Sequence, residues 1–141
     1  MQKIKFGTDG WRAIIAKEFT VENVARVSEA TGKWLLKNYD NPTVFVGHDC
    51  RFAGALFMET SVKVFLSQGL NVRMSEGFVS TPMVSLAANR FNCQIGVVLT
   101  ASHNPPSYNG YKLKADFGGP LAPEHVQEVE DLIEDTCAID L

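Results

Sequence analysis

Residues 95–112 read IGVVLTASHNPPSYNGYK, so that five apolar residues lead directly into a polar loop. The run IGVVL at 95–99 is short and rich in β-branched residues, which predicts a strand buried on both faces of a sheet. Ligands of open α/β sheets bind beyond the carboxyl ends of the strands. The loop at 100–110 leaves this strand at its carboxyl end, and it is therefore the first candidate for a functional site.

Short apolar runs alternate with helical patterns along the rest of the chain. Thr20 is the predicted N-cap of the first helix, which the spacing of its apolar residues indicates. The predicted strands are 3–6, 12–16, 43–46, 71–74, 95–99 and 111–115, and the predicted helices are 21–36, 54–68, 82–91 and 123–136. This order predicts an α/β fold, and we expect a three-layer α/β/α arrangement with a mixed, mostly parallel sheet.

The composition is that of one ordinary globular domain. The chain has 141 residues, of which 45% are hydrophobic and 21% charged, and its net charge of −3 is too small to predict a nucleic-acid-binding surface. No apolar run approaches the roughly 20 residues that span a bilayer, and the start MQKIKFGTDG lacks the apolar core of a secretory signal. We therefore expect a soluble cytoplasmic protein with no nucleic-acid or membrane partner. The three cysteines are widely spaced and are expected to be reduced structural thiols: Cys50, Cys93 and Cys137.

The loop after the apolar run carries a stiff backbone. Pro105 and Pro106 restrict the residues before them to extended conformations, so little conformational freedom is left to lose on binding. The pair Asn109-Gly110 is a strong turn signal, which predicts a reversal of the chain. Such a turn would bring the amino group of Lys112 near Ser102.

Two chemistries are open to Ser102. The adjacent His103 suggests a serine nucleophile with a histidine base. However, the side chains of neighbouring residues on an extended backbone point to opposite sides, and no G-x-S-x-G elbow surrounds the serine. A Ser102-His103 hydrolase is therefore disfavoured. A phosphorylated serine fits better, because it carries about −2 charge and needs cations and donors, for which Arg12, Lys112 and the loop amides are candidates. An ordinary turn serine remains the alternative.

Four stretches together resemble one family. TASHNP at 100–105, followed by YNGYK at 108–112, is similar to the active-site serine loop of the α-D-phosphohexomutase superfamily, the phosphoglucomutases and phosphomannomutases. FGTDGWR at 6–12, GHDCR at 47–51 and STP at 80–82 resemble three further motifs of that family, in the family's order. A set of ordered motifs is far more specific than a single short match.

The resemblance implies a mutase whose Ser102 carries a phosphoryl group. That group would pass to a hexose phosphate, giving a hexose 1,6-bisphosphate that reorients and returns its other phosphoryl group. The resemblance also implies catalytic roles for His103, Lys112 and Arg12, and a Mg²⁺ ion bound through the phosphate on Ser102. Arg51 and Asp49 are interpreted as a structural ion pair outside the catalytic set.

The resemblance covers the amino-terminal domain of this family, which we assign to residues 1–141. The family's metal loop, sugar loop and phosphate loop belong to later domains that are absent from this chain, so we expect the chain alone to have negligible mutase turnover. Its partners would be hexose phosphates, hexose 1,6-bisphosphate and the missing domains. Apolar residues exposed by their absence would favour self-association: Phe117, Leu121 and those of the last helix.

Two alternatives and one ambiguity remain. The chain could instead be a non-catalytic module that binds or senses a small molecule on the same scaffold, or, less favoured, a Ser-His hydrolase. The sequence does not distinguish glucose from mannose as the sugar. Trp11 replaces a smaller apolar residue that is usual in the N-acetylglucosamine and glucosamine branches, which argues against those sugars.

Overall fold

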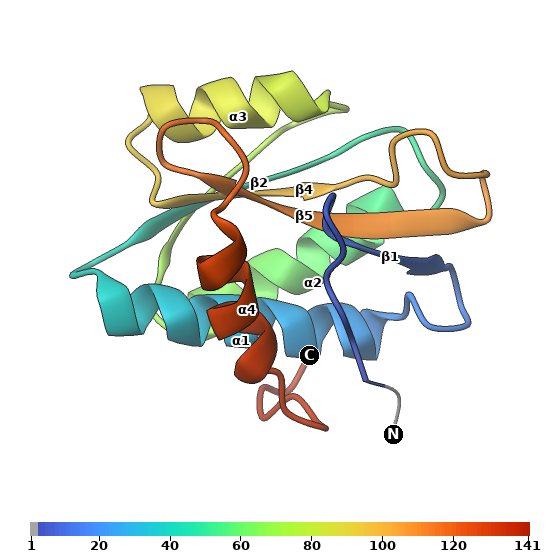
Figure 1. Ribbon diagram of the computed structural model, residues 1–141, viewed down its shortest axis with the longest axis horizontal. Coiled ribbons are helices and arrows are strands. Elements are labelled where there is room, and N and C mark those ends of the chain that lie inside the picture. The colour runs from blue at the N-terminus through green and yellow to red at the C-terminus, as the bar shows by residue number, and fades with distance from the viewer. Residues whose placement is uncertain (1–2) are drawn as a thin grey trace.

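A five-stranded sheet lies between helical layers in the computed structural model, which describes residues 3–141 (Figure 1). The strands lie in the order β1-β5-β4-β2-β3. Strand β2 pairs in parallel with β3 and β4, whereas β5 pairs antiparallel with β4 and β1, so four strands share one direction. The predicted α/β/α fold with a mixed, mostly parallel sheet is confirmed. The strands are β1 (Trp11–Ile14), β2 (Thr43–His48), β3 (Asn71–Met74), β4 (Ile95–Leu99) and β5 (Tyr108–Ala115).

The helices are distributed unequally over the two faces of the sheet. Helices α1 (Val21–Asn38), α2 (Gly54–Ser67) and α4 (Pro123–Asp131) lie on one side, and α3 (Thr81–Arg90) covers the other (Figure 1). The larger core lies between the sheet and α1 and α2, where strand residues such as Val46, Val97 and Tyr111 are fully buried. A smaller core under α3 contains Phe45, Val84, Ala88, Cys93 and Val98.

Local sequence signals set the helix boundaries. Thr20 caps α1 as predicted, because its hydroxyl oxygen accepts a hydrogen bond from the Asn23 amide at 3.2 Å. Ser80 caps α3 in the same way, and Pro82 lies in the first turn, where its missing N–H costs no hydrogen bond. Helix α4 ends at Asp131, five residues earlier than predicted. The chain there turns across α1, since the Arg26 side chain donates to the carbonyl of Glu134 at 2.6 Å.

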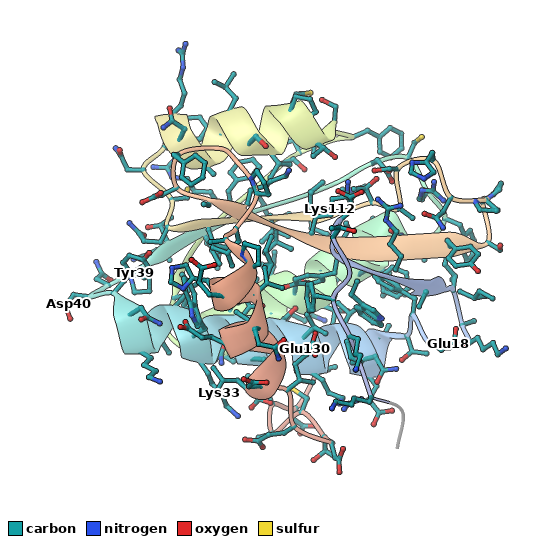
Figure 2. The ribbon with its side chains drawn as sticks, in the orientation of Figure 1. Glu18, Lys33, Tyr39, Asp40, Lys112 and Glu130 are labelled. Carbon is teal, nitrogen blue, oxygen red and sulfur yellow. The ribbon has the colours of Figure 1, made fainter. Side chains whose placement is uncertain are left out.

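One predicted strand and one predicted turn are wrong. Residues 3–6 are not a strand: the Phe6 amide donates to the carboxylate of Glu130 at 2.8 Å. Figure 2 labels Glu130, which lies on α4. Asn109 and Gly110 do not form a turn but continue β5, where they pair with β1. A Cβ on Gly110 would collide with the Thr100 carbonyl oxygen, so glycine is needed here for close strand packing rather than for chain reversal.

The expected interdomain surface is only partly exposed. The Phe117 side chain is 69% exposed, as predicted, but Leu121 is buried. In the last helix Val129 is buried, and Val126 is half-buried against the core. Cys93 is also buried, as expected for a structural thiol, whereas Cys50 is exposed. None of the helices within residues 3–141 has the length and apolar character to cross a membrane.

Candidate functional site

The loop from Thr100 to Ser107 follows β4 and precedes β5, at the carboxyl end of β4 as predicted. Ser102 is exposed near the start of this loop, and its hydroxyl oxygen accepts a hydrogen bond from the Lys112 ammonium at 2.8 Å. The Ser102 amide donates to the Thr100 hydroxyl oxygen at 3.1 Å. The predicted approach of Lys112 to Ser102 is therefore present, although the pairing of β4 with β5 causes it rather than a turn at 109–110.

Ser102 has a backbone φ of 50°, in the left-handed region. The expectation that the backbone around Ser102 is extended is therefore wrong. Within residues 3–141 the Ser102 hydroxyl has no hydrogen bond to His103, whose side chain is exposed. The geometry favours a serine paired with a lysine over a Ser-His dyad.

Lys112 lies among other cations. It shares one face of the sheet with Lys114, two residues along β5, and with Arg12 on β1, which pairs with β5. Partial burial lowers the pKa of Lys112, and the positive charge of Arg12 lowers it further. The face of the sheet on which α3 packs therefore carries three cationic side chains beside Ser102, of which Arg12 is paired with Asp9, and this gathering of cations favours an anionic group on the serine.

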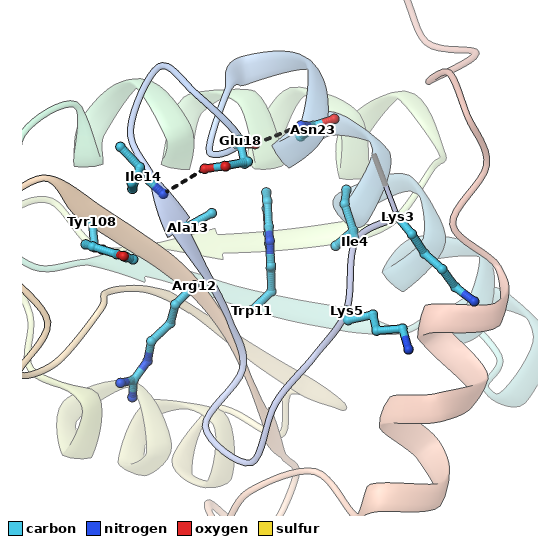
Figure 3. Close-up of a pocket in the computed structure, with 10 residues that line it drawn as sticks. All are labelled: Lys3, Ile4, Lys5, Trp11, Arg12, Ala13, Ile14, Glu18, Asn23 and Tyr108. Atoms are coloured by element: carbon cyan, nitrogen blue, oxygen red, sulfur yellow. Dashed lines mark hydrogen bonds between the residues drawn. The ribbon is translucent and has the colours of Figure 1, made fainter. Parts of the chain in front are cut away.

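Arg12 connects β1 to the serine loop. Its side chain leaves β1 on the opposite side from the buried Trp11 (Figure 3). One terminal nitrogen donates to the Asn104 side-chain oxygen at 2.7 Å, and the other lies 3.6 Å from the Asp9 carboxylate. Within the described part of the chain, its buried Nε has no acceptor. Arg12 thus lies beside the serine loop, and its role in catalysis stays a prediction.

The hollows near these residues include one beside Arg12 and one beside Ser102. One of about 340 Å³, between β1 and the amino-terminal segment, is lined by Arg12 but not by Ser102 (Figure 3). The other, of about 400 Å³, contains Ser102 and has a mainly apolar wall that includes the 78% exposed side chain of Phe52. We take the second as the candidate site because it contains the serine. Its lining is Asp49, Cys50, Arg51, Phe52, Ser102, Asn104 and Pro106.

Residues at the end of β2 support the serine loop. Arg51 and Asp49 form the predicted ion pair, with 3.8 Å between Arg51 Nε and a carboxylate oxygen. Arg51 also donates to the carbonyls of the serine loop, and the Thr100 hydroxyl donates to Asp49. Sequence reasoning missed these contacts. The parallel pairing of β2 with β4, which brings their carboxyl ends together, is the signal that could have found them.

The described residues do not complete a metal site. Residues 3–141 contain no group of three or more His, Cys, Asp or Glu side chains placed to hold a metal ion. Mg²⁺ needs near-octahedral coordination by six oxygens, whereas the serine loop would contribute one side-chain oxygen from Ser102. The residues present therefore do not fit a resident Mg²⁺ ion by themselves.

The fold and site define an α/β/α domain that holds an exposed serine against a lysine at the carboxyl edge of its sheet. Residues 3–138 match the family model for phosphoglucomutase/phosphomannomutase, alpha/beta/alpha domain I. The chain belongs to this family, as its motifs predict.

The relatives of this chain are named after more than one sugar. The chain is 39% identical over 128 residues to a phosphoglucomutase/phosphomannomutase from Thermococcus kodakarensis, covering 90% of this chain and 28% of that protein. It is 36% identical over 129 residues to a phosphoglucosamine mutase from Geobacillus thermodenitrificans, covering 92% and 29%. A crystal structure from Thermus thermophilus, assigned as a phosphomannomutase, superimposes with a TM-score of 0.93 at 40% identity, covering 96% and 31%. The chain thus spans less than a third of each of these proteins.

These names leave the choice of sugar open. A phosphoglucosamine mutase is about as similar to the chain as a phosphoglucomutase/phosphomannomutase is. The argument from Trp11 against the glucosamine branch gains no support from them and stays a prediction.

Proposed function

We propose that this chain is the phosphoserine-carrying domain of a phosphohexomutase, an enzyme that interconverts hexose 1-phosphate and hexose 6-phosphate through a hexose 1,6-bisphosphate. The observation that carries the proposal is the 2.8 Å contact between Lys112 Nζ and Ser102 Oγ on a positively charged face. A phosphate on Ser102 would add a charge of about −2 beside Lys112. Phosphoryl transfer depends mainly on positioning and charge stabilisation.

In the proposed reaction, one phosphoryl group moves from the bisphosphorylated sugar to Ser102. Ser102 Oγ attacks phosphorus of the bisphosphorylated sugar, a new O–P bond forms, and the bond from phosphorus to the sugar oxygen breaks. The proton that Oγ loses passes through solvent to the departing sugar oxygen, so the products are a phosphoserine and a hexose monophosphate. Lys112 stabilises the charge that develops at Ser102, since its ammonium already donates to Oγ. His103 and Arg12 are proposed to act at the same site.

The described residues are not expected to sustain turnover by themselves. Completing the cycle needs a site that recognises the sugar, and the expected Mg²⁺ would need ligands beyond those described above. The purified 141-residue chain should therefore not interconvert hexose 1- and 6-phosphates at an enzyme-like rate. Acceptance of one phosphoryl group needs only a single transfer, so it can be measured over a long incubation without turnover.

Intact-mass analysis after incubation with glucose 1,6-bisphosphate tests the proposal. The wild-type chain should gain the mass of one phosphoryl group, and Ser102→Ala should not gain it. Ser107→Ala, in the same loop, is the matched control and should be labelled like the wild type. If the wild type is never labelled although it is folded, the alternative of a non-catalytic binding or regulatory module is favoured instead.

A further inference from the structure

The guanidinium of Arg51 contacts four main-chain carbonyls around the serine. One terminal nitrogen, Nη2, donates to the carbonyls of Ser102 at 2.8 Å and Asn104 at 2.7 Å. The other, Nη1, donates to the carbonyls of Pro105 at 2.8 Å and Tyr108 at 2.9 Å. The side chain is only 12% exposed. A planar guanidinium with fixed donors thereby defines the positions of four peptide groups.

The serine loop needs such support because regular structure does not provide it. Between Ala101 and Ser107 the backbone belongs to neither helix nor strand. Ser102 adopts the left-handed region, which costs a non-glycine residue about 1 kcal/mol or more and persists only where the surroundings enforce it. Arg51 binds the carbonyl oxygen of Ser102 itself, and this fixes the orientation of that peptide group. The orientation of the peptide group in turn directs the serine side chain toward Lys112.

Asp49 completes the support from the same end of β2. One of its carboxylate oxygens accepts from the Arg51 amide at 3.1 Å, and the other accepts from the Thr100 hydroxyl. The Thr100 hydroxyl oxygen in turn accepts from the Ser102 amide. The peptide groups on both sides of Ser102 are therefore tied to residues 49–51.

The same contacts argue against Arg51 as a binder of the sugar phosphate. The four N–H bonds of its terminal nitrogens each have a carbonyl acceptor, and its Nε faces Asp49 at 3.8 Å. An incoming anion would have to displace existing hydrogen bonds. Arg12 differs, because its Nε has no acceptor within the described residues.

We propose that Arg51 is a positioning residue for phosphoryl transfer, which holds the Ser102 loop in the conformation that directs the serine hydroxyl to Lys112. This inference rests on the proposed function. It extends the interpretation of Arg51 and Asp49 as an ion pair, because the serine loop is the element that they support.

Arg51→Lys tests the inference, because lysine keeps the charge but cannot span four carbonyls. Misplacing a reacting group by about 1 Å can cost about 100-fold in rate, so labelling of Ser102 by glucose 1,6-bisphosphate should slow about 100-fold. Hydrogen exchange at the hydrogen-bonded loop amides of Ser102 and Asn104 should accelerate, while the amides of β4 and of β5 from residue 109 onward remain protected. The matched control is Arg73→Lys, at an arginine that stacks on Phe91 and lies on β3, the edge strand beyond β2; it should change neither readout.

Rescue separates positioning from general stability. Arg51→Ala should recover part of its labelling rate in millimolar guanidinium ion, which can enter the vacated space, and a merely destabilised protein would not recover. Labelling of Arg51→Lys at the wild-type rate, with unchanged exchange in the loop, would overturn the inference. If the wild type is not labelled but the loop loosens in Arg51→Lys, the proposed function fails while the support by Arg51 stands.

A measurement on the wild type covers the case in which the variants do not fold. In nitrogen-resolved NMR, four hydrogen-bonded Nη protons should give separate, slowly exchanging signals, because rotation of the guanidinium is blocked. A single averaged signal from a freely rotating Arg51 side chain would overturn the inference.

Discussion

Replacing Lys112 by methionine removes the charge next to Ser102 and keeps an unbranched side chain of similar length. In the structure Lys112 Nζ lies 2.8 Å from Ser102 Oγ, within hydrogen-bonding distance. A hydrogen bond to a charged group contributes about 1.5–3 kcal/mol. Since each 1.4 kcal/mol is about a factor of ten, the labelling of Ser102 by glucose 1,6-bisphosphate should slow by about 10- to 150-fold in Lys112→Met.

The assay is the time course of the phosphorylated mass, measured with the donor in excess. Lys114→Met is the matched control, because Lys114 lies on the same face of β5 two residues further on. Within residues 3–141 its amino group makes no hydrogen bond to Ser102, so its loss should change the rate less than about threefold, through the weaker long-range field alone. If Lys112→Met were labelled at the wild-type rate, or if both variants were slowed equally, the direct contact of Lys112 with Ser102 would have no part in the transfer.

Three further predictions concern stability. The pKa of Lys112 is lowered in the folded state, so just below pH 10.5 this group holds more protons in the unfolded chain than in the folded chain. Its contribution to the free energy of unfolding should therefore rise with pH in that range, and in urea titrations the wild type should gain stability relative to Lys112→Met as the pH rises; a difference that does not change with pH would contradict this. Tyr111→Phe removes a fully buried hydroxyl, whose pKa burial raises to about 12, and the loss of its hydrogen bond should cost about 1 kcal/mol in urea unfolding; no loss would contradict this. Gly110→Ala should cost about 2 kcal/mol or more because its Cβ meets the Thr100 carbonyl, whereas Gly77→Ala, which meets nothing within 4 Å, should change stability by less than about 0.5 kcal/mol; equal effects would refute the packing argument.

The sequence predicted the elements that depend on local patterns. The buried run at 95–99 became β4 with the same bounds, and Thr20 caps α1 as expected. Both predictions rest on residues that specify their own conformation, through continuous apolar character in the strand and a side-chain acceptor in the cap. The position of the serine loop at the end of β4 follows directly from the first of them.

The errors arise where contacts distant in sequence override a local signal. Asn109-Gly110 has the local signature of a turn, but pairing with β1 keeps both residues in β5. Ser102 is left-handed rather than extended, in a loop whose carbonyls bind Arg51, a residue 51 positions away. No periodic pattern in the sequence predicts the contact of Arg51 with the serine loop. The contact forms because β2 and β4 are neighbours in the sheet.

Tandem mass spectrometry of the chain after prolonged incubation with glucose 1,6-bisphosphate distinguishes a phosphoserine domain from a non-catalytic module, since it locates the transferred phosphate. The phosphoryl group should be found on Ser102, whose hydroxyl the structure places against Lys112. An unmodified Ser102 in the folded chain, or a phosphate found on Thr100 or Ser107 instead, would contradict it.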